Sequence, residues 1–401
     1  MVKLSDYRDL VGDRILHEIY KKARKLYGKR IINANATSTG GGVVEILQSL
    51  VPLMNDVGIF AGWRVLHGNP DFFSVTKKIH NALQGKNVEF SEEELYLYKK
   101  TNEEFSAYTH LNHDVVIIHD SQPMSLIDHY RKNQPWISRL HIDLSEKTNI
   151  LDYLKNFLIK YDKIIVSSDD YRINNFPVEQ CVIRPAIDPF TIKNKKLSDS
   201  EIKKCLDQYN IPTDKPIITQ VSRFDKFKQP SEVIDIFEKV KKKIDCRLIL
   251  IGGSASDDPE GIEVFNEVKN KAEGFGKDII LITVESGLLV NAIQSIADVV
   301  IQFSSKEGFG LTVTEAMFKG KPVVSTRTGG ISLQIKDSDN GFLVDPWDVN
   351  GASDRVIELL KNKKLAESLG LSARENVIDK FLMTRLLSGY MSMIIEVLYG
   401  E

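Results

Sequence analysis

Residues 304–319 read Ser-Ser-Lys-Glu-Gly-Phe-Gly-Leu-Thr-Val-Thr-Glu-Ala-Met-Phe-Lys, and this stretch decides the fold. The apolar run over residues 298–303 predicts a buried strand directly before it. Gly308 and Gly310 allow a tight turn, and the following Thr-Val-Thr-Glu predicts the start of a helix. A strand, a glycine turn and a helix N-terminus together form an anion site, because the first amides of a helix have no partners within it.

Two carboxylates, Glu307 and Glu315, flank this turn with seven residues between them. Carboxylates beside a phosphate-binding turn indicate contacts with hydroxyl groups, which a sugar or a ribose offers. The alternative is that Thr312 and Glu315 form a capping box and that Glu307 is a solvated turn residue. Spacing alone favours this alternative for Glu315.

Strands and helices alternate on both sides of this stretch. Strands are predicted in the first half at 29–35, 59–66, 114–120, 136–142 and 163–168, and in the second half at 216–222, 246–252, 278–284, 298–303 and 322–326. Such alternation implies mostly parallel sheets that helices cover on both faces. We therefore predict an α/β protein with two doubly wound, Rossmann-like domains whose strand carboxyl ends face a cleft.

The prolines and polar run of residues 185–215 predict a connection between the two domains. The first domain is expected to span residues 1–190, joined by a C-terminal helix over 381–401. The second is expected to span residues 191–380. A length of 401 residues fits two domains.

Composition limits the class of protein and its partners. Apolar residues at 42% and charged residues at 27% are typical of a soluble globular protein, and a net charge of -2 gives no case for nucleic acid or an acidic membrane. No signal peptide is visible, and no apolar run approaches the ~20 residues that span a bilayer. Three widely separated cysteines match no metal spacing. We expect a cytoplasmic protein with small-molecule substrates; a homodimer is compatible with the sequence, which does not fix the oligomeric state.

Polar residues gather at the predicted strand ends of the first half. The strand over 114–120 places His119, Asp120 and Gln122 at its carboxyl end, and the strand over 136–142 places His141 there. All eight histidines lie at or before His141, so any imidazole chemistry belongs to this half. For His119 and His141 a functional role and a hydrogen-bonded structural role both stay open.

Three further motifs each allow a functional and a purely structural interpretation. The glycines of residues 37–42 follow the first strand, where such folds bind phosphates or sugars, but they match neither the dinucleotide nor the P-loop fingerprint and could form only a tight turn. Arg223 and Lys228 follow a strand of the second half and could neutralise a diphosphate without a metal, or be two surface cations. Asp337 and Asp339 have the spacing of a divalent-ion motif, but they precede Asn-Gly and predict a turn.

The combination of Arg223, Lys228, Glu307 and Glu315 resembles the retaining GT-B glycosyltransferases of family four. Further segments are similar to the archaeal trehalose glycosyltransferring synthases and spread the resemblance over nearly the whole chain: 40–53, 72–85, 119–123, 141–145 and 328–335. The chain departs from the family at Gln229, where glycine is common. Its loop over residues 285–289 is short and lies near the expected base pocket, so nucleotide preference stays open.

The resemblance implies reversible transfer of glucose from ADP-, UDP- or GDP-glucose to free glucose, giving α,α-trehalose. It places the acceptor in the first domain and the nucleotide sugar in the second. Arg223 and Lys228 would hold the diphosphate, assisted by the amides near Gly41 and Gly42. No cofactor is implied; magnesium is compatible with this chemistry, but no metal site is encoded.

The resemblance also implies contacts with the sugars. Glu315 would take the ribose hydroxyls, and Glu307 would contact the transferred glucose together with the backbone of Gly308, Phe309, Gly310 and Leu311. Asp120 and His141 match positions near the acceptor and the reacting carbon. Gln122 and Thr312 complete the predicted substrate site.

Several alternatives stay open at this stage. A trehalose phosphorylase would use phosphate in place of the nucleotide, another family-four transferase would use other sugars, and a two-domain sugar-binding protein would not catalyse transfer. Retention could arise by a carboxylate nucleophile or by same-face attack with the leaving phosphate as base. The resemblance favours same-face attack. The physiological direction is not encoded.

Overall fold

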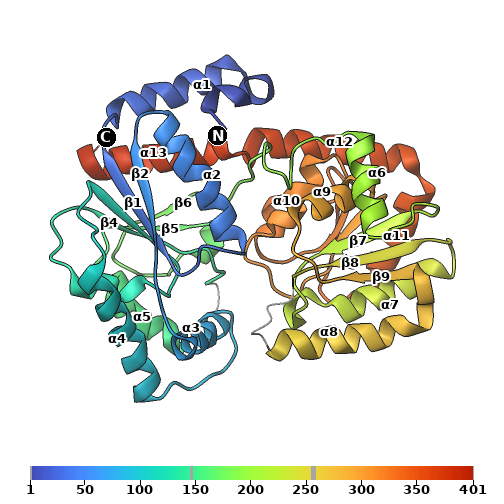
Figure 1. Ribbon diagram of the computed structural model, residues 1–401, viewed down its shortest axis with the longest axis horizontal. Coiled ribbons are helices and arrows are strands. Elements are labelled where there is room, and N and C mark those ends of the chain that lie inside the picture. The colour runs from blue at the N-terminus through green and yellow to red at the C-terminus, as the bar shows by residue number, and fades with distance from the viewer. Residues whose placement is uncertain (1, 145–147, 254–258, 401) are drawn as a thin grey trace. The chain divides into compact units, whose positions relative to one another are not determined.

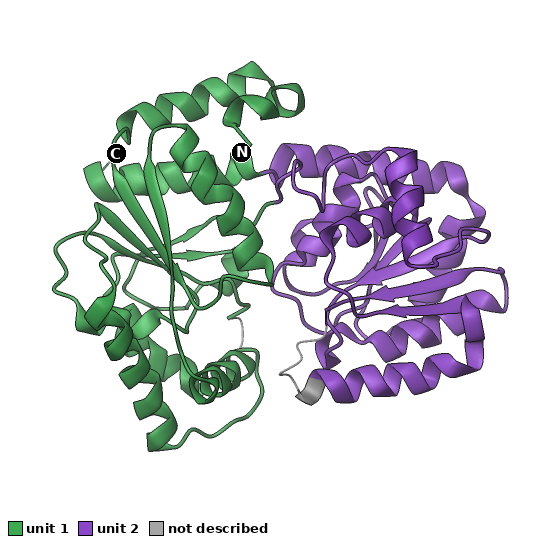
Figure 2. Ribbon diagram, in the orientation of Figure 1, with its two compact units in different colours: residues 1–186, 383–401 green, residues 187–382 purple. Residues whose placement is uncertain are grey.

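The computed structural model describes residues 2–144, 148–253 and 259–400. Two compact units divide the chain: residues 1–186 with 383–401 form unit 1, and residues 187–382 form unit 2 (Figure 2). The sequence had placed these boundaries at 190/191 and 380/381. The backbone amide of Ile187 donates to the carbonyl of Phe381 at 2.9 Å. The two segments where the chain passes between the units therefore lie side by side.

Unit 1 contains a six-stranded sheet in the order β2-β1-β3-β4-β5-β6 (Figure 1). Every neighbouring pair is parallel. The strands are β1 (Arg30–Asn35), β2 (Phe60–Val65), β3 (Val115–His119), β4 (Trp136–Arg139), β5 (Lys163–Val166) and β6 (Gln180–Val182). The helices are α1 (Arg8–Lys25), α2 (Gly42–Asp56), α3 (Pro70–Leu83), α4 (Glu92–Tyr108), α5 (Asn149–Leu158) and α13 (Met383–Tyr399).

Successive side chains of a strand point to opposite faces of the sheet, and the two faces of this sheet have different surroundings. Ile32, Val116 and Ile118 point into an apolar core that α3, α4 and α5 cover. The opposite face lies under α2 and α13 and carries polar residues, including Lys163. Its side chain is 2% exposed, and its ammonium lies 2.6 Å from Glu396 of α13 and 3.0 Å from Glu179, so an ion-paired side chain connects the last helix to the first sheet.

Unit 2 repeats this architecture with a six-stranded parallel sheet in the order β12-β11-β10-β7-β8-β9. The strands are β7 (Ile217–Val221), β8 (Arg247–Ile251), β9 (Ile279–Ile282), β10 (Val299–Gln302), β11 (Val323–Thr326) and β12 (Phe342–Val344). The helices are α6 (Asp199–Gln208), α7 (Pro230–Lys241), α8 (Pro259–Ala272), α9 (Gly287–Ile296), α10 (Leu311–Phe318), α11 (Val349–Lys361) and α12 (Lys363–Lys380). One apolar core lies under α7, α8 and α11, and a second lies under α6 and α9.

The parallel α/β fold predicted from the sequence is confirmed, with local differences. Residues 185–215 are not only a connection, because α6 forms within them. Ser198 accepts a hydrogen bond from the amide of Glu201, whose carboxylate bonds back to the amide of Ser198, so a complete capping box starts this helix. The strand predicted over 136–142 is shorter, because β4 ends at Arg139.

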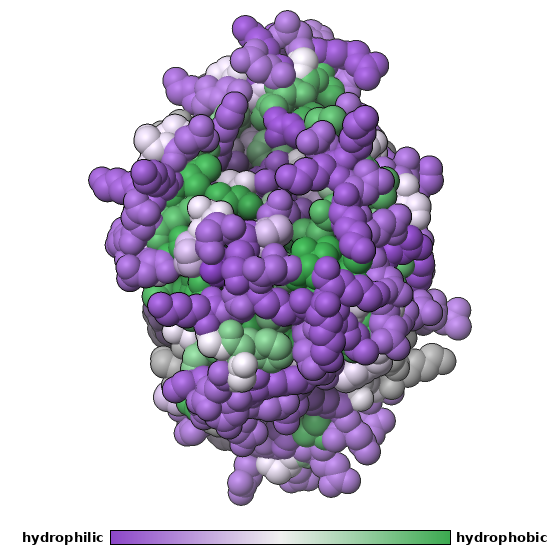
Figure 3. Space-filling model, turned by 90° about the vertical axis from the view of Figure 1, so that its right-hand side faces the viewer, coloured by the Kyte–Doolittle hydropathy of each residue, from purple (hydrophilic) through white to green (hydrophobic). Residues whose placement is uncertain are grey.

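Surface properties add two observations. Among the described residues, no helix is both long enough and apolar enough to cross a membrane. On the face that Figure 3 presents, hydrophilic side chains surround and separate small hydrophobic patches.

Candidate active site

The turn between β10 and α10 is shaped by glycine. Gly310 is the N-cap of α10 and has a φ of +85°, a conformation that favours glycine. A Cβ at this position would lie 3.1 Å from Ile331 and 3.3 Å from Glu307. The backbone therefore approaches its neighbours closely at this turn, and the first amides of α10 lie beside Glu307.

A buried glutamine, Gln334, holds this turn in place. Its amide nitrogen donates to the carbonyl of Phe309 at 2.6 Å, and its oxygen accepts from the hydroxyl of Thr314 at 2.6 Å. The amide of Gly330 donates to the carbonyl of Gly308 at 3.2 Å. No role for Gln334 was predicted from the sequence, although it belongs to the segment 328–335.

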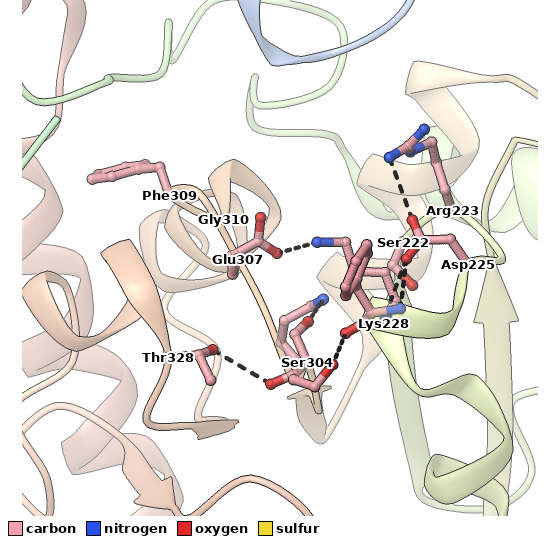
Figure 4. A network of polar contacts seen from close by, with 12 residues as sticks. Ser222, Arg223, Asp225, Lys228, Ser304, Glu307, Phe309, Gly310 and Thr328 are labelled. Atoms are coloured by element: carbon pink, nitrogen blue, oxygen red, sulfur yellow. Dashed lines mark hydrogen bonds and ion pairs between the residues drawn. The ribbon is translucent and has the colours of Figure 1, made fainter. Parts of the chain in front are cut away.

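The predicted diphosphate cations lie on the loop after β7 (Figure 4). Lys228 Nζ is 2.8 Å from Glu307 Oε2, and both side chains are about five-sixths buried, at 16% and 15% exposure. Arg223 lies 3.3 Å from Asp225 and is 65% exposed. The alternative that Glu307 is a solvated turn residue is wrong, since the lysine and the packed turn shield it. Arg223 keeps the open guanidinium that an incoming anion could reach.

Three residues fix the backbone around Lys228 through four hydrogen bonds. Asp225 Oδ1 accepts from the amides of Phe227 and Lys228, at 3.0 and 3.2 Å. The side-chain nitrogen of Gln220 donates to the carbonyl of Lys228 at 2.8 Å. The amide of Ser305 donates to the carbonyl of Phe227 at 2.8 Å, which joins this loop to the one that carries Glu307.

The next residue is Gln229, at the position where the family resemblance leads one to expect glycine. Its φ and ψ are 47° and 48°, the left-handed conformation that glycine adopts with least strain. Its side chain is 1% exposed, and neither end of its amide has a hydrogen-bond partner among the described residues.

Glu315 lies on the buried side of α10. It is 0% exposed, and its Oε1 is 2.9 Å from Lys193 Nζ. The capping-box alternative is wrong, because Gly310 is the N-cap of this helix and no side chain caps it. Lys319, one turn further on, donates to Gln294 at 3.0 Å, and burial lowers its pKa to about 8 against the opposing effect of Glu315. Neither Lys193 nor Lys319 was predicted from the sequence to belong to the site.

The remaining predicted residues of unit 2 line the same turn. The carbonyl of Thr312 accepts from Gln294 Nε2 at 3.1 Å, and the side chain of Leu311 is partly exposed. The ring of Phe309 is buried and packs 5.6 Å from the ring of Phe381, between centroids. Any substrate contact at Phe309 would thus be made by its backbone.

In unit 1 the glycine loop follows β1. Gly41 is the N-cap of α2, with a φ of +82°, and Gly41 and Gly42 are both exposed. A Cβ at Gly41 would meet no atom within 4 Å, so backbone conformation and not space requires glycine here. The amides of this loop are accessible to a ligand.

Asp120, His119 and His141 come together at the carboxyl ends of β3 and β4. Asp120 has a φ of +62°, and its Oδ1 accepts from the backbone amide of His141 at 2.7 Å. His141 Nε2 lies 2.9 Å from His119 Nδ1. Gln122 is partly exposed, and its carbonyl accepts from Asn102 at 3.1 Å.

Burial controls the charges of this cluster. It raises the pKa of Asp120 to about 6, although the His141 amide and Arg139 oppose the shift. It lowers the pKa of His119 to about 3 and that of His141 well below its ordinary value, and Arg139 adds to both shifts. Both imidazoles are therefore neutral at physiological pH, next to a carboxyl group that titrates near it.

The comparisons with known proteins agree with this division of the chain. Residues 33–173 match the family described as trehalose synthase, N-terminal domain, and residues 201–376 match glycosyl transferases group 1. The trehalose synthase of Thermococcus litoralis is 45% identical over 400 residues, covering 98% of this chain and 96% of that protein. The chain belongs to the trehalose synthase family.

The chain is also similar to more distant proteins. A trehalose phosphorylase of Grifola frondosa is 27% identical over 94% of this chain, which spans only 58% of that protein. The solved α,α-trehalose-phosphate synthase (UDP-forming) of Burkholderia xenovorans, in complex with glucose-6-phosphate, has a TM-score of 0.73 at 12% identity and covers 92% of this chain and 100% of its own. This likeness gives the chain the GT-B fold. Its match to glycosyl transferases group 1 and its identity to the trehalose synthases make it a glycosyltransferase.

In the described part of this trehalose synthase homologue, side chains do not gather into a metal-binding group. No group of three or more His, Cys, Asp or Glu residues there could hold a metal ion. Asp337 accepts from the amide of Leu343 at 2.9 Å, and Asp339 pairs with Lys336 at 3.3 Å. The prediction that these aspartates form a turn is confirmed. The loop over residues 252–258, which follows β8 and begins with two glycines, falls largely outside the described residues.

Proposed function

We propose that the protein transfers glucose from a nucleoside diphosphate glucose to free glucose and forms α,α-trehalose, with retention and reversibly. The observation that carries this proposal is the Lys228–Glu307 pair beside the glycine turn of α10, with Arg223 open next to it. A phosphate group could bind to the cations and helix amides of this arrangement. A sugar could bind to its fixed carboxylate.

In the proposed reaction, unit 2 binds the donor. Arg223 and Lys228 hold the diphosphate, and the exposed amides of Gly41 and Gly42 are proposed to assist them. Glu307 and the backbone of residues 308–311 contact the transferred glucose. As the bond from the glucose C1 to the phosphate oxygen breaks, negative charge develops on the leaving diphosphate, and fixed cations stabilise it without reorganisation.

Glu315 is proposed to bind the ribose hydroxyls. Because its carboxylate is fully buried and 2.9 Å from Lys193 Nζ, the hydroxyls would reach it only as Lys193 moves aside or shares it. Lys193 would then also contact the nucleotide. Thr312, on the same helix, completes this part of the proposed site.

Unit 1 is proposed to bind the acceptor glucose with Asp120, His141 and Gln122. The attacking glucose oxygen forms the new bond to C1, and its proton passes to the leaving phosphate oxygen in the same-face route that we favour. A double displacement through a carboxylate is the competing route. We propose that neither route requires a cofactor. The three free thiols, Cys181, Cys205 and Cys246, fit the cytoplasmic location expected from the sequence.

One experiment tests this function. The protein is incubated with ADP-, UDP- or GDP-glucose and glucose, with and without EDTA, and trehalose and nucleoside diphosphate are measured. We expect equimolar trehalose and nucleoside diphosphate with at least one donor, unchanged by EDTA. The absence of trehalose with all three donors would contradict the proposal.

A second candidate is trehalose phosphorolysis, because a phosphorylase is among the relatives. The two reactions are distinguished by incubating trehalose with inorganic phosphate alone. Glucose 1-phosphate would form only in a phosphorylase. We expect none, whereas trehalose with a nucleoside diphosphate should release glucose and the nucleotide sugar.

A further inference from the structure

Three polar side chains form a chain of hydrogen bonds on one face of the sheet in unit 1. Asn33 of β1 pairs in register with Ile117 of β3, so its side chain lies on the same face as that of His119, two residues on. Asn33 Oδ1 lies 3.0 Å from His119 Nε2, and His119 Nδ1 lies 2.9 Å from His141 Nε2. Asn33 and His119 are 0% and 1% exposed, so these atoms bond to each other and not to bulk water.

The direction of each hydrogen bond follows from the first contact. The carbonyl of Gly62 can only accept, and Asn33 Nδ2 lies 3.2 Å from it. Asn33 therefore presents its oxygen to His119, and an amide oxygen also only accepts. The hydrogen in this contact must then be on His119 Nε2.

The direction of the hydrogen bond between His119 and His141 follows from that of the first. A neutral imidazole has one N–H, so His119 Nδ1 has a lone pair and accepts. The hydrogen between the two rings is then on His141 Nε2, and His141 Nδ1 has none. Burial and the nearby Arg139 keep both rings neutral, as their lowered pKa values indicate.

We propose that Asn33 and His119 are positioning residues that fix His141 in the Nε2–H tautomer, so that its Nδ1 accepts a hydrogen bond from a hydroxyl of the acceptor sugar. His141 as a residue is partly exposed, and among the hydrogen bonds of the described residues none reaches its Nδ1. Its backbone amide is held by Asp120, which orients the residue from the other side. The assignment of the acceptor as a sugar rests on the function proposed above, whereas the tautomer follows from the hydrogen-bond geometry of two neutral rings and does not depend on that function.

The tautomer is tested by NMR on the full chain with 15N-labelled histidine. His119 and His141 are assigned by comparison with His119→Asn and His141→Gln variants. We expect both rings to show a protonated Nε2 and a bare Nδ1, unchanged from pH 5 to pH 8. An Nδ1–H signal for His141, or titration of either ring in this range, would overturn the proposal.

Addition of glucose tests the role of the bare nitrogen. We expect the Nδ1 signal of His141 to shift on saturation with glucose, as a nitrogen that accepts a hydrogen bond does, while the Nδ1 signal of His119 stays in place. A saturable change elsewhere in the histidine spectrum without a shift at His141 Nδ1 would overturn the sugar contact. This measurement needs no turnover, so it is independent of whether trehalose forms.

A matched pair of variants tests positioning. Asn at position 119 keeps an acceptor where Nδ1 lies, whereas Leu removes it, so His119→Asn should keep most of kcat/KM and His119→Leu should lose about tenfold or more. Only His119→Leu should lose the single tautomer of His141. Equal activities and equal His141 spectra in two folded variants would overturn the proposal, and so would loss of the tautomer in both.

Asn33→Asp tests the first link. A carboxylate favours protonated His119, which would then donate from Nδ1 and force the hydrogen of His141 onto its own Nδ1. We expect the His141 signals to change to that tautomer. Wild-type signals for both rings in folded Asn33→Asp would overturn the proposed chain. Failure to form trehalose with any donor, alongside the expected spectra, would contradict the proposed function and leave the tautomer established.

Discussion

At the scale of single residues, the Lys228–Glu307 pair determines how the donor half-site is oriented. The two groups come from loops 79 positions apart in the chain, and they meet at 2.8 Å because Asp225, Gln220 and Ser305 fix the backbone on which Lys228 sits. The carboxylate directs the ammonium toward the glycine turn, where the helix amides of α10 begin. A phosphate at this turn would therefore meet two kinds of positive group at once.

The first prediction concerns Lys228. Replacement by alanine should lower kcat by about 100- to 1,000-fold, because a fixed cation that stabilises the leaving diphosphate would be lost. The matched control is Lys226→Ala, in the same short helix but exposed, which should keep near-normal turnover. Steady-state kinetics with the preferred donor decides the matter. If Lys228→Ala and its control are equally active, the diphosphate role is wrong.

A second prediction concerns Asp120, whose pKa burial raises to about 6. The carboxylate predominates above this pH and is lost below it, so kcat/KM should fall as the pH drops through about 6. The Asp120→Asn variant should have a lower kcat/KM than the wild-type protein, and its kcat/KM should not fall as the pH drops through about 6. Asparagine is chosen because it tolerates the left-handed φ of this position, which alanine would strain.

The stability of the same variant provides an independent control. A carboxyl group with a raised native pKa binds its proton more tightly when folded, so its contribution to stability is present below its ordinary pKa of 3.8 and is lost as the pH rises through about 6. The stability of Asp120→Asn relative to the wild-type protein should therefore increase from pH 4 to pH 7. A constant difference in free energy of unfolding across this range would contradict the raised pKa.

At the scale of elements, the entry into α7 illustrates a local conflict. Gln229 adopts the left-handed conformation at the N-cap of this helix while burying an amide that has no partner in the described structure. Both features are costly, and glycine would avoid both. The preceding loop carries Lys228, so the conflict lies directly beside the proposed donor site.

A third prediction follows for this helix. Gln229→Gly should raise the free energy of unfolding by about 1 kcal/mol, measured by denaturant titration. Asn210→Gly is the control, because Asn210 has a similar φ of +52° but is exposed and is a residue type that tolerates it. A gain no larger than that of the control would mean that the buried amide and the strain contribute little.

Elements also show what can be read from a sequence and what cannot. The strands of four to six residues in both sheets were predicted, because buried parallel strands are short apolar runs bounded by turns. The helix α6 was missed because prolines and lysines surround it, although the Ser198–Glu201 capping box was visible. The three-residue strands β6 and β12 carry too little periodic signal to be recognised. The residues that orient the site, Gln334, Lys193 and Asn33, were missed because their roles depend on contacts between distant segments.

At the scale of the whole molecule, α13 belongs to unit 1 although it follows the entire second unit. Its buried side chains include Leu386, Leu387, Tyr390 and Ile394, and Lys163 of β5 pairs with Glu396. Without this helix the polar face of the first sheet, with the fully buried Arg139, would lose part of its cover. Unit 2, over residues 187–382, is continuous in sequence and closes its own cores.

A fourth prediction tests this asymmetry. A chain ending at residue 382 should lose protection from hydrogen exchange throughout β3 to β6, while the sheet of unit 2 stays protected. Removal of residues 400 and 401 alone serves as the control and should leave both sheets protected. Retained protection of β3 to β6 in the shorter chain would mean that unit 1 does not depend on α13.

The late position of α13 has a consequence for how the protein is made. A ribosome releases the polypeptide from its first residue to its last, so all of unit 2 emerges before the helix that completes unit 1. The second unit can thus reach its native structure during translation, whereas the first must wait, with one face of its sheet unfinished, until α13 has emerged.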